Sequence, residues 1–155
     1  SLTSLEGAPQ KVGGNFSCYN CPKLESLEGA PKVVRGSFRC YDCSKLKSLK
    51  GAPKEVVQNF NCAGCSITSL KGAPKKVKED FNCSNCHKLE SLEGAPEKVG
   101  KNFICAHCNK LVTLEGAPKK VGGDFECRYC PNLTSYQYKP EEIKGNFQYT
   151  VVNHT

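Results

Sequence analysis

The sequence predicts an all-β parallel solenoid, in which short strands of successive coils stack beside one another. The first observation is a repeat marked by six Cys-x-x-Cys pairs, whose first cysteines are 22, 22, 21, 22 and 22 residues apart. The second is that apolar residues recur at fixed positions of the repeat, and the third is a Gly-Ala-Pro turn in nearly every unit. A unit this short is one strand plus a return path, so its apolar face is buried only by neighbouring units.

Four apolar or proline columns define the repeat and predict its core. They are Leu5, Leu27, Leu49, Leu70, Leu92, Leu114 and Tyr136; Pro9, Pro31, Pro53, Pro74, Pro96, Pro118 and Pro140; Val12, Val34, Val56, Val77, Val99, Val121 and Ile143; and Phe16, Phe38, Phe60, Phe81, Phe103, Phe125 and Phe147. We expect the Phe, Leu and Val columns to be buried, and Glu28, Lys32 and the residues inside each Cys-x-x-Cys pair to face solvent.

Each coil is expected to contain one strand of four residues, such as residues 15–18, because this segment has the only clear alternation of period two. Phe16 and Cys18 then point to the same side, into the core. Cys21 follows after a turn of two residues. Proline fixes the backbone and removes a hydrogen-bond donor, and Gly-Ala-Pro in every coil would break a helix, so we expect little or no regular α-helix.

The whole chain, residues 1–155, is expected to form a single repeat domain of about seven coils. The coils are approximately residues 1–23, 24–45, 46–66, 67–88, 89–110 and 111–132, followed by a C-terminal cap over residues 133–155. The third coil is one residue short, with Ile67 in the leucine position, and we expect the sulfur columns to stay aligned across this deletion. In the cap, Tyr149 and Val152 stand where the cysteines would be, and Tyr136 and Tyr138 replace the Leu and Gly of the repeat, as terminal repeats of a solenoid are atypical.

The run Phe38, Cys43, Leu46, Leu49, Pro53 and Val56 resembles the leucine-rich-repeat family, most of all its bacterial surface-protein branch. The resemblance covers nearly the whole chain; the differences are the extra Cys40, the Gly-Ala-Pro turn and a longer step from Phe to the second cysteine. It implies a right-handed parallel solenoid that binds other molecules, and it implies no particular chemistry.

All twelve cysteines are candidate metal ligands. They are Cys18, Cys21, Cys40, Cys43, Cys62, Cys65, Cys83, Cys86, Cys105, Cys108, Cys127 and Cys130. Two Cys-x-x-Cys pairs separated by 18 residues have the spacing of an all-sulfur metal site. Stacking would bring four sulfurs of two neighbouring coils together, which predicts three sites, in coils one and two, three and four, and five and six.

Three 4Fe-4S clusters that transfer or store electrons are the first interpretation, because the Leu, Val and Phe columns already supply a core and leave no folding role for the metals. Structural zinc in a protein-interaction scaffold is the alternative, and cuprous thiolate sites are a further one. The cysteines also admit two readings without metal. One is a disulfide-laddered extracellular adhesin, and the other is plain packing, since free cysteine behaves as a small buried hydrophobe and leucine-rich repeats accept it after the strand.

Other functions are less favoured by the sequence. The net charge is +7, but Glu28 and Glu93 interrupt the lysine stripe, so nucleic acid is not favoured as a partner. His87 and His107 occur beside or within only two pairs and are read as turn residues, so we do not expect an enzyme. No apolar run is long enough to span a membrane, and we expect an intracellular monomer with an unknown redox or protein partner. The sequence begins inside a repeat unit, which suggests a piece of a longer array.

Overall fold

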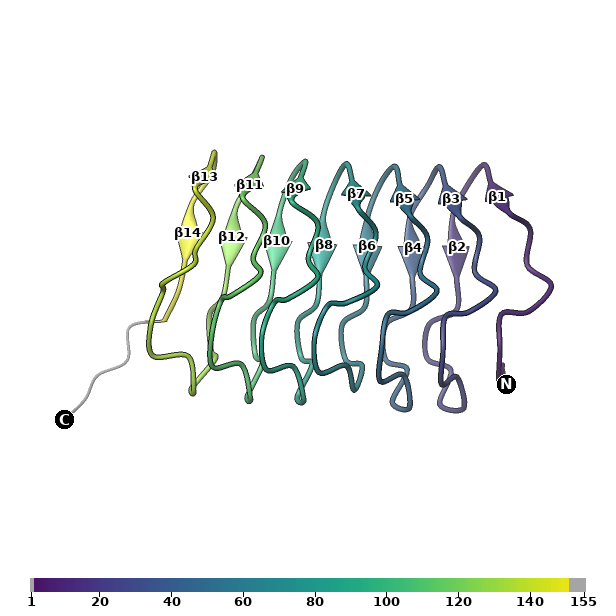
Figure 1. Ribbon diagram of the computed structural model, residues 1–155, viewed down its shortest axis with the longest axis horizontal. Helices are drawn as coiled ribbons and strands as arrows, with labels where there is room; N and C mark the ends of the chain where they lie inside the picture. The colour runs from purple at the N-terminus through teal and green to yellow at the C-terminus, as the bar shows by residue number, and fades with distance from the viewer. Residues whose placement is uncertain (1, 151–155) are drawn as a thin grey trace.

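The computed structural model describes residues 2–150 and confirms an all-β parallel solenoid (Figure 1). Fourteen strands of two residues each form two parallel sheets of seven strands, and no helix occurs in the described part of the chain. Seven rungs correspond to about six full turns between the first rung and the last.

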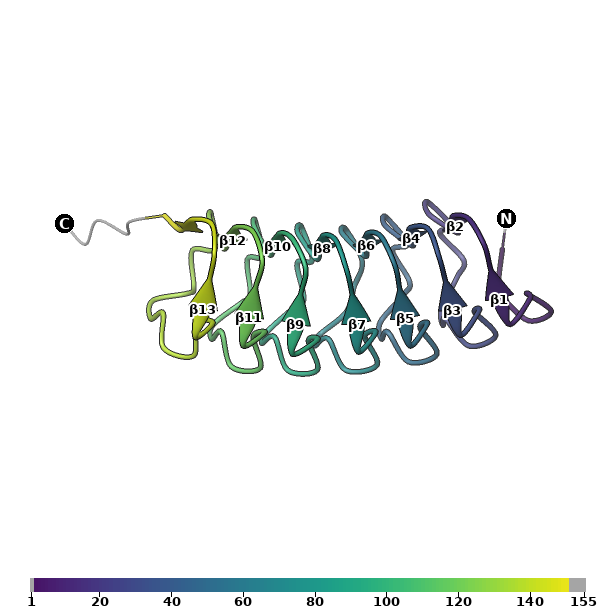
Figure 2. The ribbon, with the colours of Figure 1, turned by 90° about the horizontal axis from the view of Figure 1, so that it is seen from above.

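Each coil contributes one strand to each sheet. The first sheet contains β1 (Lys11–Val12), β3 (Val33–Val34), β5 (Glu55–Val56), β7 (Lys76–Val77), β9 (Lys98–Val99), β11 (Lys120–Val121) and β13 (Glu142–Ile143). The second contains β2 (Phe16–Ser17), β4 (Phe38–Arg39), β6 (Phe60–Asn61), β8 (Phe81–Asn82), β10 (Phe103–Ile104), β12 (Phe125–Glu126) and β14 (Phe147–Gln148). The two sheets lie on opposite sides of the stack, as the view from above shows (Figure 2).

The coils wind with a right hand. The odd-numbered strands run upward on the near side of Figure 1, the chain crosses over the top, and the even-numbered strands run downward on the far side. Meanwhile the coils advance from right to left. This is the hand that a connection between parallel strands almost always takes.

The phenylalanine column forms the centre of the core. Neighbouring rings from Phe16 to Phe125 stack with centroids 5.2 to 5.5 Å apart, and the five rings from Phe38 to Phe125 are fully buried. Leu27 and Val34 are buried as predicted, whereas Glu28 and Lys32 are exposed. Two expectations were wrong in part. In the first and last coils, Val12, Phe16, Ile143 and Phe147 are only half-buried, because within the described residues a neighbouring coil covers each on one side alone. Ser84 and Ala106, inside Cys pairs, are buried between neighbouring coils.

The valine column lies in a strand of its own, which the sequence did not predict. The predicted four-residue strand at residues 15–18 is also shorter, at two residues, but its hydrogen bonds continue past the strand. The N–H groups of Cys18 and Asn20 donate to the carbonyl oxygens of Arg39 and Tyr41 at 2.8 Å. Parallel pairing therefore extends into the Cys-x-x-Cys turn and fixes the height of each cysteine pair relative to the next.

A polar ladder connects the coils between the two sheets. In each step a side-chain oxygen of the residue before Phe accepts the N–H of its equivalent in the next coil, at 2.8 to 3.2 Å. The column consists of Asn15, Ser37, Asn59, Asp80, Asn102, Asp124 and Asn146. These bonds satisfy backbone donors at the corner where the chain passes from one sheet to the other.

The short third coil keeps its register, as predicted. Val56 pairs with Val77 and Phe60 with Phe81, as in every other coil. The deletion changes the turn after the second cysteine, where the Ser66 N–H donates to the carbonyl of Leu46, at the start of the same coil, instead of closing a local turn. The sulfur columns therefore remain aligned.

The last coil is closed by aromatic side chains. Tyr136 packs edge-on against Phe147 and donates its hydroxyl to the Thr150 carbonyl at 2.9 Å, and Tyr149 lies 5.0 Å from Phe147, centroid to centroid. Tyr149 and Tyr136 thus cover the end of the core, in agreement with a cap. Val152 lies outside the described residues. No helix long and apolar enough to cross a membrane is present in the described part of the chain.

Candidate functional site: the cysteine columns and the outer groove

The twelve cysteines form two columns along one corner of the core. All are free thiols, and eleven are buried; Cys21 is half-buried because it lies in the first coil of the described residues. Both cysteines of each pair point inward, which the strand pattern predicted for the first cysteine.

A residue in the left-handed conformation precedes the second cysteine of each pair and turns the chain so that this cysteine points into the core. The residue before it has a φ between 53° and 70° in all six pairs, at Asn20, Asp42, Gly64, Asn85, His107 and Tyr129. Asn, Asp and Gly tolerate this conformation best, and they occupy four of the six positions. His107 is therefore a turn residue, as predicted, and its ring stacks on Tyr129 with centroids 4.7 Å apart. His87 is exposed.

From the second coil to the sixth, the second cysteine of each coil donates a hydrogen bond to the coil before it. Its thiol lies 3.1 to 3.4 Å from the carbonyl oxygen of the preceding first cysteine. The bonds run from Cys43 to Cys18, Cys65 to Cys40, Cys86 to Cys62, Cys108 to Cys83 and Cys130 to Cys105. We call this set the thiol ladder. It satisfies carbonyl groups that are enclosed where the strands end.

Burial favours the protonated form of most of the cysteines. Burial raises the pKa of Cys18 and of Cys127 to about 12, and that of Cys86 to about 11. Burial also raises the pKa of the first-column thiols of Cys62, Cys83 and Cys105 well above the usual value. Neighbouring thiols add to the effect, because a second negative charge nearby would oppose ionisation. Cys130 is an exception, since its hydrogen bond with Cys108 lowers its pKa.

The sulfurs follow one another continuously instead of in separate groups of four. The thiol ladder crosses every boundary from coil one to coil six, including those between coils two and three and between coils four and five. Among residues 2–150, which include all twelve cysteines, no three Cys, His, Asp or Glu side chains are grouped so that they could hold a metal ion. In this arrangement the thiols do not fit a four-sulfur cage, and the predicted metal centres stay predictions.

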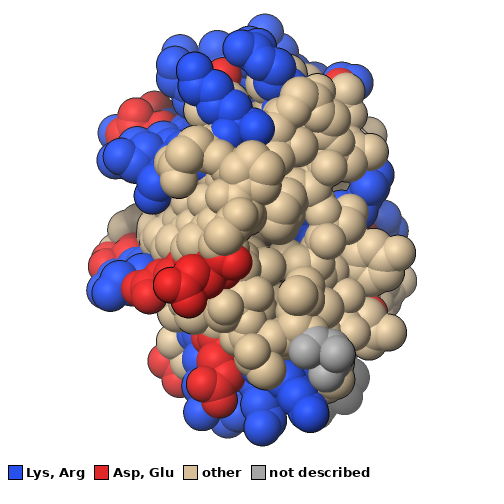
Figure 3. All heavy atoms as spheres, turned by 90° about the vertical axis from the view of Figure 1, so that its right-hand side faces the viewer, with Lys and Arg blue, Asp and Glu red and all other residues tan. Residues whose placement is uncertain are grey.

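A second feature lies on the outside of the stack and was not predicted from the sequence. The Gly-Ala-Pro turns of coils three, four and five line a groove of about 740 Å³. We call it the Gly-Ala-Pro groove. Seen from the N-terminal end, a strip of uncharged residues at the left of the molecule is recessed between two charged ridges (Figure 3). In the sequence, the only sign of this groove is that Gly-Ala-Pro recurs beside lysine. The repeat alone does not show that these turns lie in a depression of the surface.

The turn glycines allow the coils to approach closely enough to form this floor. At Gly94, φ is 96°, and an added Cβ would clash with the backbone nitrogen of Lys71 in the preceding coil. Glycine is therefore required there both by its conformation and by the space.

Comparison with known protein families, curated proteins and solved structures finds no match to this chain.

Proposed function

We propose that this protein is a binding scaffold. The cysteines stabilise the coil stack, and surface side chains that recur once in each coil contact the partner. The observation that carries the proposal is the thiol ladder: from the second coil to the sixth, each second cysteine is buried and donates a hydrogen bond to the preceding coil. Thiols engaged in this way serve as neutral core groups. The surface residues, repeated once per coil, then remain as the means of recognition.

The thiol ladder also makes the repeat of this chain similar to a leucine-rich repeat. That repeat has Asn or Cys just after its strand, followed by an apolar residue. The second cysteine occupies the equivalent place here, and Leu46 and its counterparts follow it. Stacked repeats present extended surfaces to their partners, and this is what the proposed scaffold would use.

Metal centres are the second candidate function. This function is supported by the number of sulfurs and by their arrangement in two continuous, mostly buried columns. Such centres would have to draw the twelve cysteines into new groups and break hydrogen bonds of the thiol ladder. Iron-sulfur clusters would supply one-electron transfer, and zinc would supply only cross-links between coils.

Metal analysis of protein purified without oxygen separates the two. The scaffold predicts a colourless protein without stoichiometric metal, whose thermal unfolding midpoint is unchanged by a strong chelator. A brown protein that contains iron and sulfide in equal amounts and is bleached by dithionite would establish the electron-transfer function instead. A colourless protein with three zinc ions and a midpoint lowered by the chelator would establish structural zinc.

A further inference from the structure

We infer that the Gly-Ala-Pro groove binds an acidic peptide segment in an extended conformation. The inference rests on the proposed scaffold function and names its partner by chemistry. Four lysines and one glutamate line the groove: Lys32, Lys54, Lys71, Lys75 and Glu97. The lining residues therefore carry a net charge of +3, and complementary charge selects an acidic partner.

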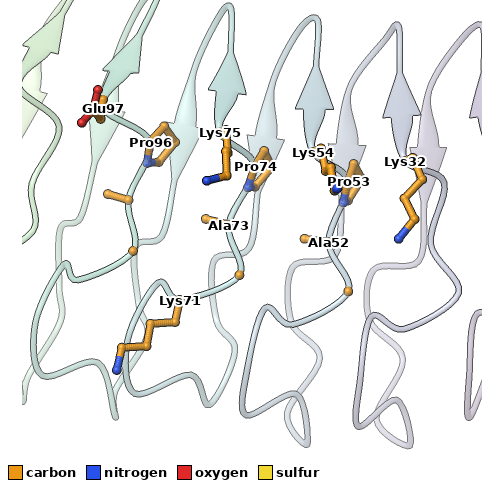
Figure 4. A pocket seen from close by; sticks show the side chains of 14 residues that line it. Lys32, Ala52, Pro53, Lys54, Lys71, Ala73, Pro74, Lys75, Pro96 and Glu97 are labelled. Atoms are coloured by element: carbon orange, nitrogen blue, oxygen red, sulfur yellow. The ribbon is translucent and has the colours of Figure 1, made fainter.

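The lysines border the groove from both sides. Figure 4 shows Lys32, Lys54 and Lys75 on successive coils along the edge next to the proline rings, while Lys71 lies on the other edge. The Lys54 N–H donates to the Lys32 carbonyl at 2.9 Å and the Lys75 N–H to the Lys54 carbonyl at 3.0 Å, so these three residues are stacked one coil apart.

The three stacked lysines lack a partner within the described chain. Lys71 forms an exposed ion pair with Glu93 at 3.6 Å, but within residues 2–150 no carboxylate lies at salt-bridge distance from Lys32, Lys54 or Lys75. Like charges side by side on neighbouring strands repel one another. Carboxylates of a bound ligand would relieve that repulsion.

The floor of the groove favours a peptide over a nucleic acid. It consists of Gly, Ala and Pro from three coils, with Pro53, Pro74 and Pro96 buried. No aromatic side chain is among the lining residues, and single-stranded nucleic acids are held largely by stacking on aromatic rings. Small apolar side chains of a peptide suit a floor of alanine and proline.

The length of the groove sets the size of the segment. Lys32 and Glu97 are three coils apart, which is about 14 Å at the usual spacing of parallel strands. An extended peptide of about five residues covers this distance. Because Glu97 closes one end, the peptide is expected to carry acidic residues along the lysines and a neutral or basic residue at Glu97.

The test measures binding of a fluorescent peptide, Glu-Ala-Glu-Ala-Ala, by fluorescence anisotropy. The double variant Lys54→Glu/Lys75→Glu is expected to bind at least about tenfold more weakly, since each reversal replaces an attraction by a repulsion. The control Lys45→Glu/Lys88→Glu makes the same change in net charge at exposed residues outside the groove, and it should stay within about twofold of the parent. Glu97→Lys should tighten binding.

Three results would overturn the inference: no binding by the parent protein, equal loss in the two double variants, or a single-stranded oligonucleotide that displaces the peptide and depends on the same two lysines. All variants change exposed side chains, and circular dichroism verifies that they fold. A protein that is free of metal but does not bind the peptide would overturn this inference alone, whereas a protein with stoichiometric iron and sulfide would overturn the scaffold function itself.

Discussion

Phe16 and Phe81 occupy the same column in the first and fourth coils, yet their surroundings differ. Phe81 is fully buried between Phe60 and Phe103, with both ring centroids 5.2 Å away. Phe16 is half-buried and stacks only on Phe38, at 5.5 Å. The difference shows that the environment of a residue depends on its place in the stack, because each coil is completed by its two neighbours.

The two ends also differ from each other. At the last coil, Phe147 is tilted by 58° from Phe125 and is surrounded by Tyr136 and Tyr149. At the first coil no such cap lies over Phe16 within the described chain. Aromatic residues at the last coil thus replace the missing neighbour, whereas the half-buried Cys21 and Phe16 mark the open face.

The largest expected effect compares the two phenylalanines directly. Phe81→Ala should lower the free energy of unfolding by about 3 to 5 kcal/mol, as a large-to-small change in a filled core. Phe16→Ala should cost roughly 1 to 2 kcal/mol, because less apolar surface is lost from the interior. Denaturant unfolding of both variants measures the difference, and equal costs would contradict a stack completed by neighbours.

Two turn glycines with the same backbone conformation allow a second comparison between the first coil and the middle of the stack. Gly94 and Gly7 have φ values of 96° and 91°, but a Cβ at Gly7 would meet nothing within 4 Å, whereas one at Gly94 would meet Lys71. Gly7→Ala should cost about 1 kcal/mol, for the left-handed conformation alone. Gly94→Ala should cost about 1 to 3 kcal/mol more, because the backbone has to move. Equal unfolding free energies for the two variants would rule out the close approach of the coils.

Alkaline pH should weaken the middle of the stack through its buried thiols. The pKa of Cys83 is raised in the folded protein by burial, and the usual value for an accessible thiol is about 9. Its contribution is therefore fully present below pH 9 and is lost as the pH rises, since the unfolded chain ionises first. For each such thiol the loss at pH 10 is about 1 kcal/mol.

The variant Cys83→Ala isolates this effect from the titration of lysines, which is common to both proteins. Denaturant unfolding at pH 8 and pH 10 should show the stability gap between parent and variant changing by about 1 kcal/mol in favour of the variant. A gap independent of pH would mean that Cys83 ionises as easily in the folded chain as in the unfolded one.

The sequence was sufficient to predict the solenoid, because the repeat period and the Phe, Leu and Val columns together demand stacked coils. It was insufficient for the second sheet. The strand at Val56, two residues long, lacks an alternation that could reveal it, and its partners lie one coil away. The polar ladder of Asn59 and its equivalents escaped for the same reason, since its hydrogen bonds join residues 21 or 22 positions apart.

The cysteines show where spacing alone was an incomplete guide. Cys-x-x-Cys repeated at intervals of about 22 residues is compatible with a metal site, a disulfide or a buried hydrogen-bonded column. The choice depends on the direction of each Sγ atom, which the left-handed residue at Asn85 or Gly64 controls. That turn directs the second thiol toward a carbonyl of the preceding coil, a contact that no sequence pattern specifies.

Counting reactive thiols tests the central claim, that the cysteines form a neutral, buried ladder, most directly. In the native protein, kept under oxygen-free conditions without reductant, one thiol should react quickly with an aromatic disulfide reagent, and Cys21→Ser should abolish that fast phase, since the other eleven thiols are buried. In denaturant all twelve should react, with no metal released. Fewer than twelve reactive thiols would indicate disulfides, and iron or zinc released together with the thiols would contradict the account.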